Sequence, residues 1–255
     1  MKLQVLGCSG GIGGRAMRTT SLLVDDDILI DAGTGVAELE VAQLALIDHV
    51  FITHSHLDHL AFLPLMIDSV GHLRDKPLVM HASQATQDII RAHIFNWQIW
   101  PDFSEIPSRD NPRLQFNVIE VGQTIDLNGR KVSALPANHT VPALGYQLDS
   151  GAGSLVFTGD TGVNDALWPQ LNQIANLRYL IIETAFPNQE RQLALLSKHL
   201  CPSLLADELS KLESSPEIFI THLKPGQADL IMQEIADNPG RHRPRMLCTD
   251  QVFEF

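Results

Sequence analysis

The residues of this 255-residue chain that are best suited to chemistry lie in one short stretch, Thr53 to Leu60, which reads Thr-His-Ser-His-Leu-Asp-His-Leu. Three imidazoles and one carboxylate fall within the six residues from His54 to His59. Neutral imidazole nitrogens and carboxylate oxygens are ligands that suit zinc and the neighbouring transition metals. A solvated polar turn has no need of so many ligand-type side chains, so the stretch predicts a metal site.

The neighbouring residues indicate how this stretch is held. An apolar run typical of a buried strand precedes it, and apolar residues at helical spacing follow it over residues 60–70. Alternate side chains of an extended segment point the same way, so His54 and His56 can hold one ion. The first turn of the helix directs Asp58 and His59 toward a second position. The spacing therefore predicts two adjacent metal positions on a strand-to-helix turn.

Further polar residues recur where predicted strands end. The set comprises Asp31, His54, His139, Asp160, Glu183 and His222. Strand ends that gather on one edge are where α/β folds place chemistry, so we expect these side chains to converge. Glycines on both sides of Asp160 allow its backbone to fold close to an ion. Asp31 either supports the site from behind the ligands or caps a turn.

Composition limits the classes of partner. The formal net charge is −12, and 44% of the residues are hydrophobic, as in a protein with a substantial core. A protein that grips nucleic acid normally carries a basic excess or a basic stripe. The one dense basic cluster, residues 241–245, is interpreted as a solvated loop. Large nucleic acids are therefore unlikely partners, whereas a small phosphorylated molecule attracted by metal ions is compatible with the charge.

Cysteine usage and hydropathy indicate a reduced protein outside the membrane. Cys8, Cys201 and Cys248 are widely spaced and form no Cys-x-x-Cys pair, which argues against a disulfide framework and against a thiolate metal site. No apolar stretch approaches the ~18 residues of a membrane helix. The N-terminus enters a strand pattern directly and lacks the regions of a signal peptide. We expect a cytoplasmic protein.

The elements that position the ligands are predicted by local patterns. The glycine-rich loop of residues 7–14 is followed by a hairpin instead of a helix, so it is no dinucleotide-binding fingerprint. It is instead a flexible rim or a place where the backbone approaches something closely. Helices are expected over residues 36–46 and 84–95, and Asn128-Gly129 predicts a tight hairpin. An apolar strand ending in Thr-His occurs at His54 and again at His222, which predicts two similar halves.

An aromatic and proline-rich segment around residues 96–112 interrupts this pattern. It holds Trp97, Trp100 and Phe103 among several prolines, and the proline density argues against regular structure. Three interpretations stay open. The segment is a lid or pocket wall whose rings meet a flat ligand, a dimer contact, or an aromatic plug over the core.

Four segments together resemble the metallo-β-lactamase superfamily. They are Thr53-His-Ser-His-Leu-Asp-His59, Asn138-His-Thr140, Thr158-Gly-Asp-Thr161 and Thr221-His222. The resemblance covers essentially all of residues 1–255 and implies one α/β domain, a four-layer αββα sandwich with its site at one edge of the two sheets. It assigns His54, His56 and His139 to one metal ion, and Asp58, His59 and His222 to a second, with Asp160 bridging.

A narrower resemblance is to the class II cyclic-nucleotide phosphodiesterases. It rests on Gly7-Cys-Ser-Gly-Gly11, Trp100-Pro-Asp-Phe103, Ile182-Glu-Thr-Ala-Phe-Pro-Asn188, Ser197-Lys-His-Leu200 and His222-Leu-Lys-Pro225. This resemblance implies hydrolysis of 3′,5′-cyclic AMP to the 5′-monophosphate by a hydroxide between two divalent ions, Zn²⁺ first and Mn²⁺ or Fe²⁺ as alternatives. A homodimer is a reasonable expectation for this family.

The same resemblance suggests roles around the metals. Asp58, His199 and Glu183 are the expected catalytic residues: His199 would steady the developing charge or protonate the leaving oxygen, and Glu183 would orient its ring. The alternative for His199 is a helix-terminal histidine. The expected substrate contacts are His199, Trp97, Trp100, Phe103 and Asn138. Lys224 either touches phosphate or is a solvated loop lysine.

Other functions on the same frame stay open. The sister family is the tRNA 3′-processing endonuclease, and thioester or lactone hydrolysis is a further alternative. A non-catalytic metal-dependent binding protein belongs to a different class. It is disfavoured because a purely structural zinc site usually has only four ligands. A flavodiiron-type redox role is disfavoured because such sites carry a carboxylate where His56 stands.

Overall fold

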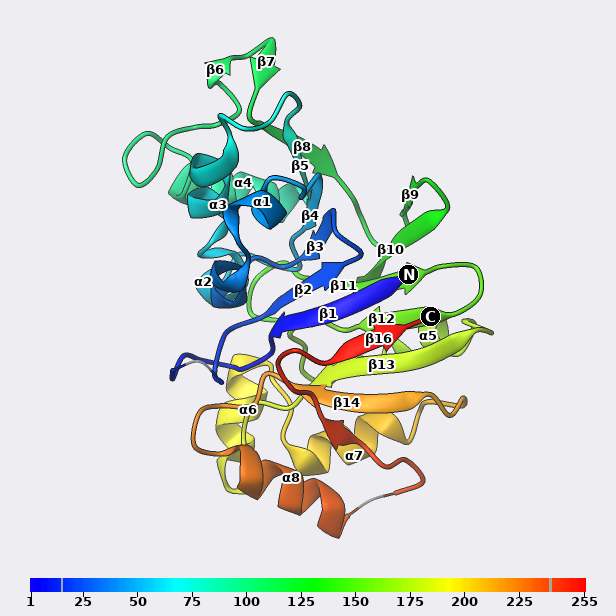
Figure 1. Cartoon of the computed structure of the whole chain (residues 1–255). Coiled ribbons are helices and arrows are strands. Elements are labelled where there is room, and N and C mark those ends of the chain that lie inside the picture. The colour runs from blue at the N-terminus through cyan, green and yellow to red at the C-terminus, as the bar shows by residue number, and fades with distance from the viewer. Residues whose placement is uncertain (15, 239) are drawn as a thin grey trace.

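The computed structural model describes residues 1–14, 16–238 and 240–255, and two seven-stranded sheets lie face to face in it (Figure 1). In spatial order the first sheet comprises β16 (Val252–Glu254), β1 (Lys2–Gly7), β2 (Ser21–Val24), β3 (Ile28–Ile30), β4 (His49–Phe51), β5 (Leu78–Ala82) and β8 (Leu114–Val118). The second comprises β15 (Arg245–Met246), β14 (Glu217–Thr221), β13 (Leu177–Glu183), β12 (Ser154–Phe157), β11 (Leu144–Asp149), β10 (Arg130–Pro136) and β9 (Thr124–Leu127).

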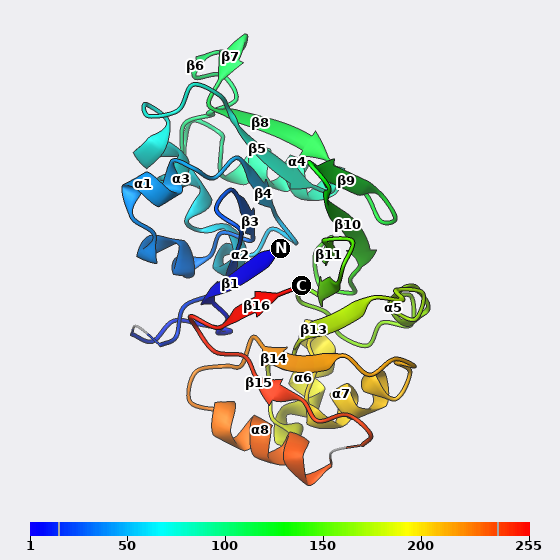
Figure 2. The ribbon, with the colours of Figure 1, turned by 45° about the vertical axis from the view of Figure 1, so that its right-hand side comes forward.

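Helices cover the outer face of each sheet, which completes the four-layer αββα sandwich that the resemblance implied (Figures 1 and 2). The first half carries a 3₁₀ helix over Thr34–Glu38, α1 (Val41–Leu44), α2 (Leu57–Leu60), α3 (Leu63–Val70) and α4 (Gln84–His93). The second half carries α5 (Trp168–Leu171), a 3₁₀ helix over Asn188–Glu190, α6 (Arg191–Ser197), α7 (Pro202–Leu209) and α8 (Ala228–Asp237).

The two halves repeat one arrangement. In the first sheet the neighbours β3, β4, β5 and β8 are parallel, and in the second sheet β12, β13, β14 and β15 are parallel. The matching strands β4 and β14 each lead into a Thr-His pair, as the repeated sequence predicted. Parallel strands place their carboxyl ends on the same edge, so this arrangement brings both histidines to one side of the sandwich.

Three apolar layers hold the sandwich together. The central layer fills the space between the sheets and includes the buried rings of Phe51, Tyr146 and Phe157. Of the two outer layers, one packs the first sheet against α3 and α4, and the other packs the second sheet against α7 and α8. The strands next to the helices are therefore buried on both faces, which explains why they read as continuous apolar runs.

Local expectations for the helices are met in part. The Ser83 hydroxyl accepts a hydrogen bond from the backbone N–H of Thr86 and caps α4, and the tight turn at Asn128-Gly129 joins β9 to β10. The single helix expected over residues 36–46 is wrong, because a 3₁₀ turn and the short α1 occupy that range. The helix pattern of residues 60–70 is divided into α2 and α3. Pro64 in the first turn of α3 has no N–H to continue the hydrogen-bond ladder from α2.

The aromatic segment forms a loop that ends in a small hairpin, β6 (Pro107–Ser108) and β7 (Asn111–Pro112). Phe103 is 2% exposed and packs against Phe95 in the core of the first half. Trp100 packs against the same core, whereas Trp97 is 60% exposed. For Phe103 the aromatic-plug interpretation is therefore correct.

The two termini lie side by side in both views of the ribbon (Figures 1 and 2). The amino group of Met1 donates a hydrogen bond of 2.8 Å to the carbonyl oxygen of Phe255, and β16 pairs with β1. The last strand therefore closes the first sheet although it follows the second half in sequence. Within the described ranges, no helix has the length and apolar character needed to cross a membrane.

Candidate metal centre

Polar residues from both halves meet at the edge where the parallel strands end. His54 follows β4, His139 follows β10, Asp160 follows β12 and His222 follows β14. These four side chains are at most 5% exposed, as is His59 on α2. His56 and Asp58 are half-buried at the mouth of the site. The seven residues expected to hold metal thus come together from segments far apart in the sequence.

Three imidazoles form the first group. Candidate ligand atoms of His54, His56 and His139 all lie within 4.8 Å of one another. Nε2 of His139 lies 3.1 Å from Nδ1 of His56, and the rings of His54 and His139 have centroids 4.9 Å apart. This spacing suits one ion with three nitrogen ligands and an open position for water or substrate.

Carboxylates and imidazoles form the second group. Candidate ligand atoms of Asp58, His59, Asp160 and His222 also lie within 4.8 Å of one another. Oδ2 of Asp160 lies 3.3 Å from Nε2 of His59 and 3.7 Å from Nε2 of His54. Because Asp160 faces both groups with one carboxylate, it is placed where a bridging ligand between two ions would stand.

Three buried nitrogen atoms test whether these residues fit metal ions. Nε2 of His54, Nε2 of His59 and Nδ1 of His222 are buried and have no hydrogen-bond partner among the residues that the structure describes. An unsatisfied buried polar atom costs roughly 1–3 kcal/mol, and the few that persist in folded proteins call for an explanation. All three point into the cluster of candidate ligands. Coordination of divalent cations would satisfy them, so the donor set fits metal.

Contacts behind the ligands orient their rings. The backbone N–H and the hydroxyl of Thr53 donate to Asp31, and Asp31 accepts from Nδ1 of His59 at 2.7 Å. The hydroxyl in turn accepts from Nδ1 of His54 at 3.0 Å. Each ring therefore carries its proton on Nδ1 and turns Nε2 toward the cluster, the arrangement that metal-binding histidines usually show. Asp31 is the supporting residue that one of its two interpretations described.

His139 is oriented by a residue whose role the sequence did not predict. Its Nδ1 donates to the backbone carbonyl of Lys198 at 3.1 Å, and Lys198 Nζ donates to the carbonyl of His139 at 2.9 Å. Lys198 adopts φ = 52° at the end of α6, a left-handed conformation that costs energy for a non-glycine residue. A carbonyl contact leaves no signature in a sequence, and the only signal was that Lys198 precedes His199.

Burial keeps the ligand imidazoles neutral. It lowers the pKa of His139 to about 4 and that of His222 to about 3, and it lowers the pKa of His54 well below its usual value. For His59, burial acts in the same direction, but Asp160 and Asp31 outweigh it and raise the pKa well above the usual value. The first three rings thus offer lone pairs near pH 7, and a cation between the carboxylates would replace the proton of His59.

The glycine-rich loop reaches the site through backbone contacts. The N–H of Gly10 donates to the carbonyl of Leu223 at 3.0 Å, and the N–H of His222 donates to the carbonyl of Cys8 at 2.8 Å. A Cβ atom on Gly10 would lie 2.3 Å from the carbonyl oxygen of His222. The expectation of a close backbone approach is confirmed, and its partner is a candidate metal ligand.

His199 and Glu183 form a buried pair beside the ligands. Nδ1 of His199 lies 2.7 Å from Oε1 of Glu183, whose other oxygen accepts from the backbone N–H of Leu200. The ring of His199 stacks on that of His222 with centroids 5.1 Å apart. Burial alone would lower the pKa of His199, but Glu183 outweighs it and the net pKa is raised. The pair therefore favours the protonated form of an imidazole next to the metal ligands.

The expected substrate contacts have other partners in this structure. The side-chain amide of Asn138 donates to the carbonyl of Val163 at 2.7 Å, so it holds the loop that carries Asp160. The backbone N–H of Trp97 donates to Trp100, and that of Trp100 donates to Ile94. Within the described residues, the hydrogen bonds and ring contacts of Trp97, Trp100 and Phe103 stay within that half and reach no candidate metal ligand.

Lys224 lies at the rim of the site. Its Nζ donates to the carbonyl of Gly10 at 2.8 Å and lies 3.5 Å from Nε2 of His222. Its ammonium is also 5.8 Å from the centroid of the Phe186 ring. One of the three ammonium hydrogens is thus occupied by Gly10, and Lys224 adds a positive charge at the edge of the metal cluster.

Fold and ligand set together define a metal-binding αββα sandwich, and a comparison with protein families names it. The profile described as "Beta-lactamase superfamily domain" matches residues 26–237. The match spans most of the chain, so this protein belongs to the β-lactamase superfamily. Membership confirms the family that the metal motifs indicated and makes a metal-dependent hydrolase the expected class of enzyme.

Curated relatives fall into two groups. A probable 3′,5′-cyclic-nucleotide phosphodiesterase of Yersinia pestis is 29% identical over 205 residues, covering 70% of this chain and 57% of the relative. A 3′,5′-cyclic-nucleotide phosphodiesterase of Aliivibrio fischeri is 29% identical and covers 64% and 52%. Ribonuclease Z of Haloarcula marismortui is 25% identical and covers 58% and 47%. The chain thus spans about half the length of these relatives.

Solved structures agree on the fold. Unliganded yeast PDE1 superposes with a TM-score of 0.82 at 19% identity and covers 100% of this chain and 99% of its own. The metallo-β-lactamase fold protein YhfI from Bacillus subtilis superposes with a TM-score of 0.78 at 18% identity, covering 100% and 98%. At this level of identity the similarity establishes the four-layer sandwich and nothing finer.

Proposed function

We propose that this protein is a metal-dependent phosphodiesterase that hydrolyses a 3′,5′-cyclic nucleotide, cyclic AMP foremost, to the 5′-monophosphate. One observation carries the proposal: Asp160 belongs to one of two neighbouring groups of ligand-type side chains and lies 3.7 Å from His54 of the other, and His199, whose pKa is raised by Glu183, lies beside them. Two relatives at 29% identity are named as 3′,5′-cyclic-nucleotide phosphodiesterases, which supports the substrate class.

We propose two divalent cations, Zn²⁺ first, with Mn²⁺ or Fe²⁺ as alternatives for this nitrogen and oxygen donor set. His54, His56 and His139 would hold one ion, Asp58, His59 and His222 the other, and Asp160 both. When bound, such a pair supplies an activated water and neutralises charge on the phosphate oxygens. The substrate carries one negative charge, so this local field attracts it although the formal net charge of the protein is −12.

The chain's own residues have separate tasks in the reaction. Glu183 accepts from Nδ1 of His199 and leaves Nε2 as the nitrogen available to the substrate. A proton at Nε2 can pass to the 3′ oxygen as its bond to phosphorus breaks, which removes the need to expel a bare alkoxide. Lys224 adds positive charge at the rim, where it can steady the phosphate.

The metal content and the substrate range test the proposal together. Purified protein loaded with Zn²⁺ or Mn²⁺ is offered cyclic AMP, cyclic GMP, bis(p-nitrophenyl) phosphate and a precursor tRNA. We expect two metal equivalents per chain and turnover of cyclic AMP. Asp58→Ala should retain about one equivalent and lose at least about 10²-fold in turnover, because it removes a ligand of the second ion.

The same four substrates also distinguish the competing functions. Cleavage of precursor tRNA alone would indicate a ribonuclease Z activity instead, an alternative supported by the ribonuclease Z relative that is 25% identical. Two bound metals with no turnover of any phosphodiester would contradict the proposal and favour thioester or lactone hydrolysis, or a binding role. The Arg109→Gln variant serves as a control for the effects of mutation and purification. Arg109 is exposed on the β6–β7 hairpin, and Glu105 is its one ion-pair partner among the described residues.

A further inference from the structure

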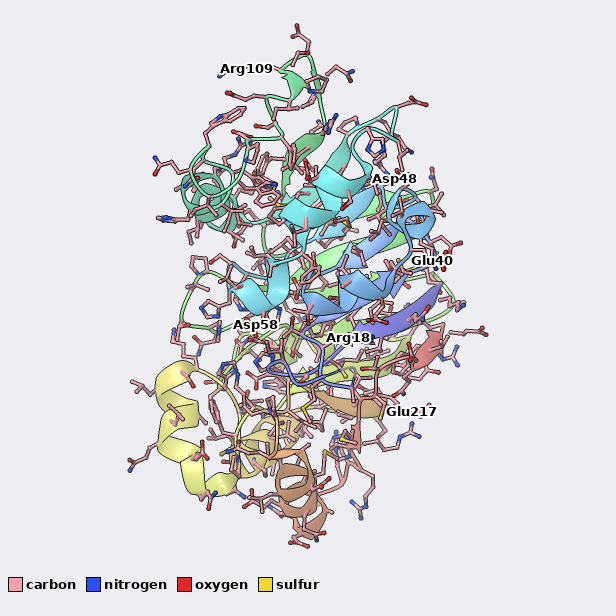
Figure 3. The ribbon with its side chains drawn as sticks, turned by 60° about the vertical axis from the view of Figure 1, so that its left-hand side comes forward. Arg18, Glu40, Asp48, Asp58, Arg109 and Glu217 are labelled. Atoms are coloured by element: carbon pink, nitrogen blue, oxygen red, sulfur yellow. The ribbon has the colours of Figure 1, made fainter. Side chains whose placement is uncertain are left out.

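A cavity away from the metal centre lies at the end of the first half that carries the β6–β7 hairpin. Its volume is about 220 Å³, and its walls come from α1, α3, the start of β5 and the hairpin. In Figure 3, Asp58 at the metal centre lies near the junction of the two halves, whereas Arg109 of the hairpin lies at the far end. The cavity is therefore separate from the metal centre, and the hairpin belongs to the aromatic and proline-rich segment that the proposed reaction does not use.

One wall of this cavity is apolar. Met66, Ile67 and Val70 come from one face of α3, and Leu44 comes from α1. The hairpin contributes Pro112. A surface of this kind suits the hydrocarbon or aromatic part of a small molecule, which loses contact with water when it binds.

The other wall is basic. Arg74, Lys76 and Arg113 line the cavity together with a single carboxylate, Asp75. This excess of positive charge is unusual in a chain with a formal net charge of −12. Lys76 is neutralised by Asp48, which also accepts from Arg74. Within residues 1–14, 16–238 and 240–255, Arg113 has no such counter-charge.

The guanidinium of Arg113 is unpaired in the part of the chain that the structure describes, where neither a hydrogen bond nor an ion pair of its side chain is found. Its backbone N–H is used by the loop, donating to Phe103 and Ile106. The side chain lies against Gly71, where an added Cβ would meet its Cδ at 2.6 Å. A half-buried guanidinium held beside an apolar wall without a partner offers a planar fork for a carboxylate or phosphate group.

Arg74 adds a fixed guanidinium to the lining of the cavity. Its two terminal nitrogens donate to the carbonyl of Ala45 and to Asp48, which fix the side chain in place. Its Nε is buried and has no hydrogen-bond partner, and the side chain is only 7% exposed. Because Nε is closed off from solvent, it is out of reach of a ligand in the cavity, and among the described residues Arg113 supplies the free donors of this site.

We propose that this cavity is a binding site for a small organic anion, in which a carboxylate or phosphate group meets Arg113 while an apolar body lies against α3. This site is independent of the proposed reaction. Because α3 directly follows α2, which carries Asp58 and His59, a ligand here would contact the element next to the metal ligands.

Calorimetric titration of the zinc-loaded, full-length protein tests the proposal. The probes are 2-naphthoate, octanoate and phenyl phosphate, with 2-naphthylmethanol as the matched neutral molecule. We expect at least one anionic probe to bind, and the neutral molecule to bind about tenfold or more weakly. The carboxylate and phosphate probes distinguish the two kinds of anionic group.

Variants separate this cavity from the metal centre. Arg113→Gln should weaken binding about 10- to 100-fold, and Leu44→Trp should abolish it by filling the cavity. Arg109→Gln, on the exposed tip of the same hairpin, should leave binding unchanged, and Asp58→Ala, which alters the metal centre, should leave the affinity for 2-naphthoate unchanged. Binding that survives both Arg113→Gln and Leu44→Trp would overturn the proposal. The absence of binding by every anionic probe at about 10 mM, a concentration at which even weak sites are occupied, would also overturn it.

Discussion

At the scale of single residues, the contact between His199 and Glu183 determines what the site can do beyond binding metal. A histidine whose Nδ1 is held at 2.7 Å by a buried carboxylate has one free nitrogen, and the carboxylate favours the protonated ring. The stacked ring of His222 keeps this imidazole within reach of the metal ligands. The pair therefore resembles a general acid more than a further ligand.

This assignment gives a prediction that depends on the leaving group. His199→Gln should lower kcat for cyclic AMP about 10²- to 10⁴-fold, because the 3′ alkoxide needs a proton. The same variant should lower kcat for bis(p-nitrophenyl) phosphate much less, because p-nitrophenolate leaves without one. Steady-state kinetics with both substrates, at matched metal content, measure the difference.

The matched variant for this test is Glu183→Gln. It keeps the size of the side chain but removes the charge that raises the pKa of His199, so activity on cyclic AMP should fall while metal content is retained. An equal loss on both substrates in His199→Gln would contradict proton donation and would indicate that the ring only steadies the phosphate.

At the scale of elements, the glycine-rich loop and the end of β14 are locked together by backbone contacts. The carbonyl of Cys8 accepts from the N–H of His222 and from the hydroxyl of Thr221 at 3.1 Å. His222 itself adopts φ = 61°, a strained conformation that its surroundings must hold in place. The loop therefore helps to aim a metal ligand, although it contributes none itself.

A methyl group at Gly10 tests this role. In Gly10→Ala the new Cβ would lie 2.3 Å from the carbonyl oxygen of His222, so one backbone must move. We expect the second metal ion to bind about 10- to 100-fold more weakly, the usual effect of disturbing a ligand's support, with the first ion little affected. Competition with a chelator measures both affinities.

Gly13→Ala is the control for that variant. Among the described residues, the three atoms nearest to its Cβ all belong to the flexible side chain of Met17, which can rotate away. Both affinities should stay near those of the unchanged protein. Equal affinities for the second ion in Gly10→Ala and Gly13→Ala would show that the loop does not position His222.

Sequence patterns predicted some of these elements and contacts and missed others. Strands and the ligand cluster from His54 to His59 were predictable because alternation, apolar runs and ligand types are written in neighbouring residues. The division between α2 and α3 was missed because the apolar period continues across Pro64. Support for His139 from Lys198 was missed because it uses a backbone carbonyl, which every residue has.

At the scale of the whole molecule, the convergence of distant segments followed from the family motifs more than from local patterns. His139, Asp160 and His222 meet the first cluster because two halves with parallel strands face each other. The cavity beside the β6–β7 hairpin is marked by no sequence motif, because it combines α1, α3 and a hairpin that only the fold brings together. Periodicity identifies elements, but it does not identify which of their faces meet.

The stability of the sandwich should depend on pH through a histidine pair in the first sheet, far from any ligand role. His81 on β5 accepts from the amide of Asn117 on β8, and its Nε2 lies 3.0 Å from Nδ1 of His49 on β4. This chain of hydrogen bonds across three strands requires both rings to be neutral. Burial, with a smaller contribution from His49, lowers the pKa of His81 to about 3.

The sign of the effect follows from proton uptake. Below the unfolded pKa of about 6.5, the unfolded chain gains a proton at this residue while the folded protein does not, so stability falls with decreasing pH down to about 3. For His81 alone the loss of stability between pH 8 and pH 5 is about 2 kcal/mol.

The His81→Gln variant tests this effect, because glutamine keeps a donor and an acceptor but cannot be protonated. It should be less stable than the unchanged protein at pH 8, and the difference should shrink by about that amount at pH 5. Urea unfolding at pH 8 and pH 5 measures the free energy of unfolding of both proteins, with His72→Gln at an exposed position as the control. A difference between His81→Gln and the unchanged protein that is the same at both pH values would contradict the role of the buried pair.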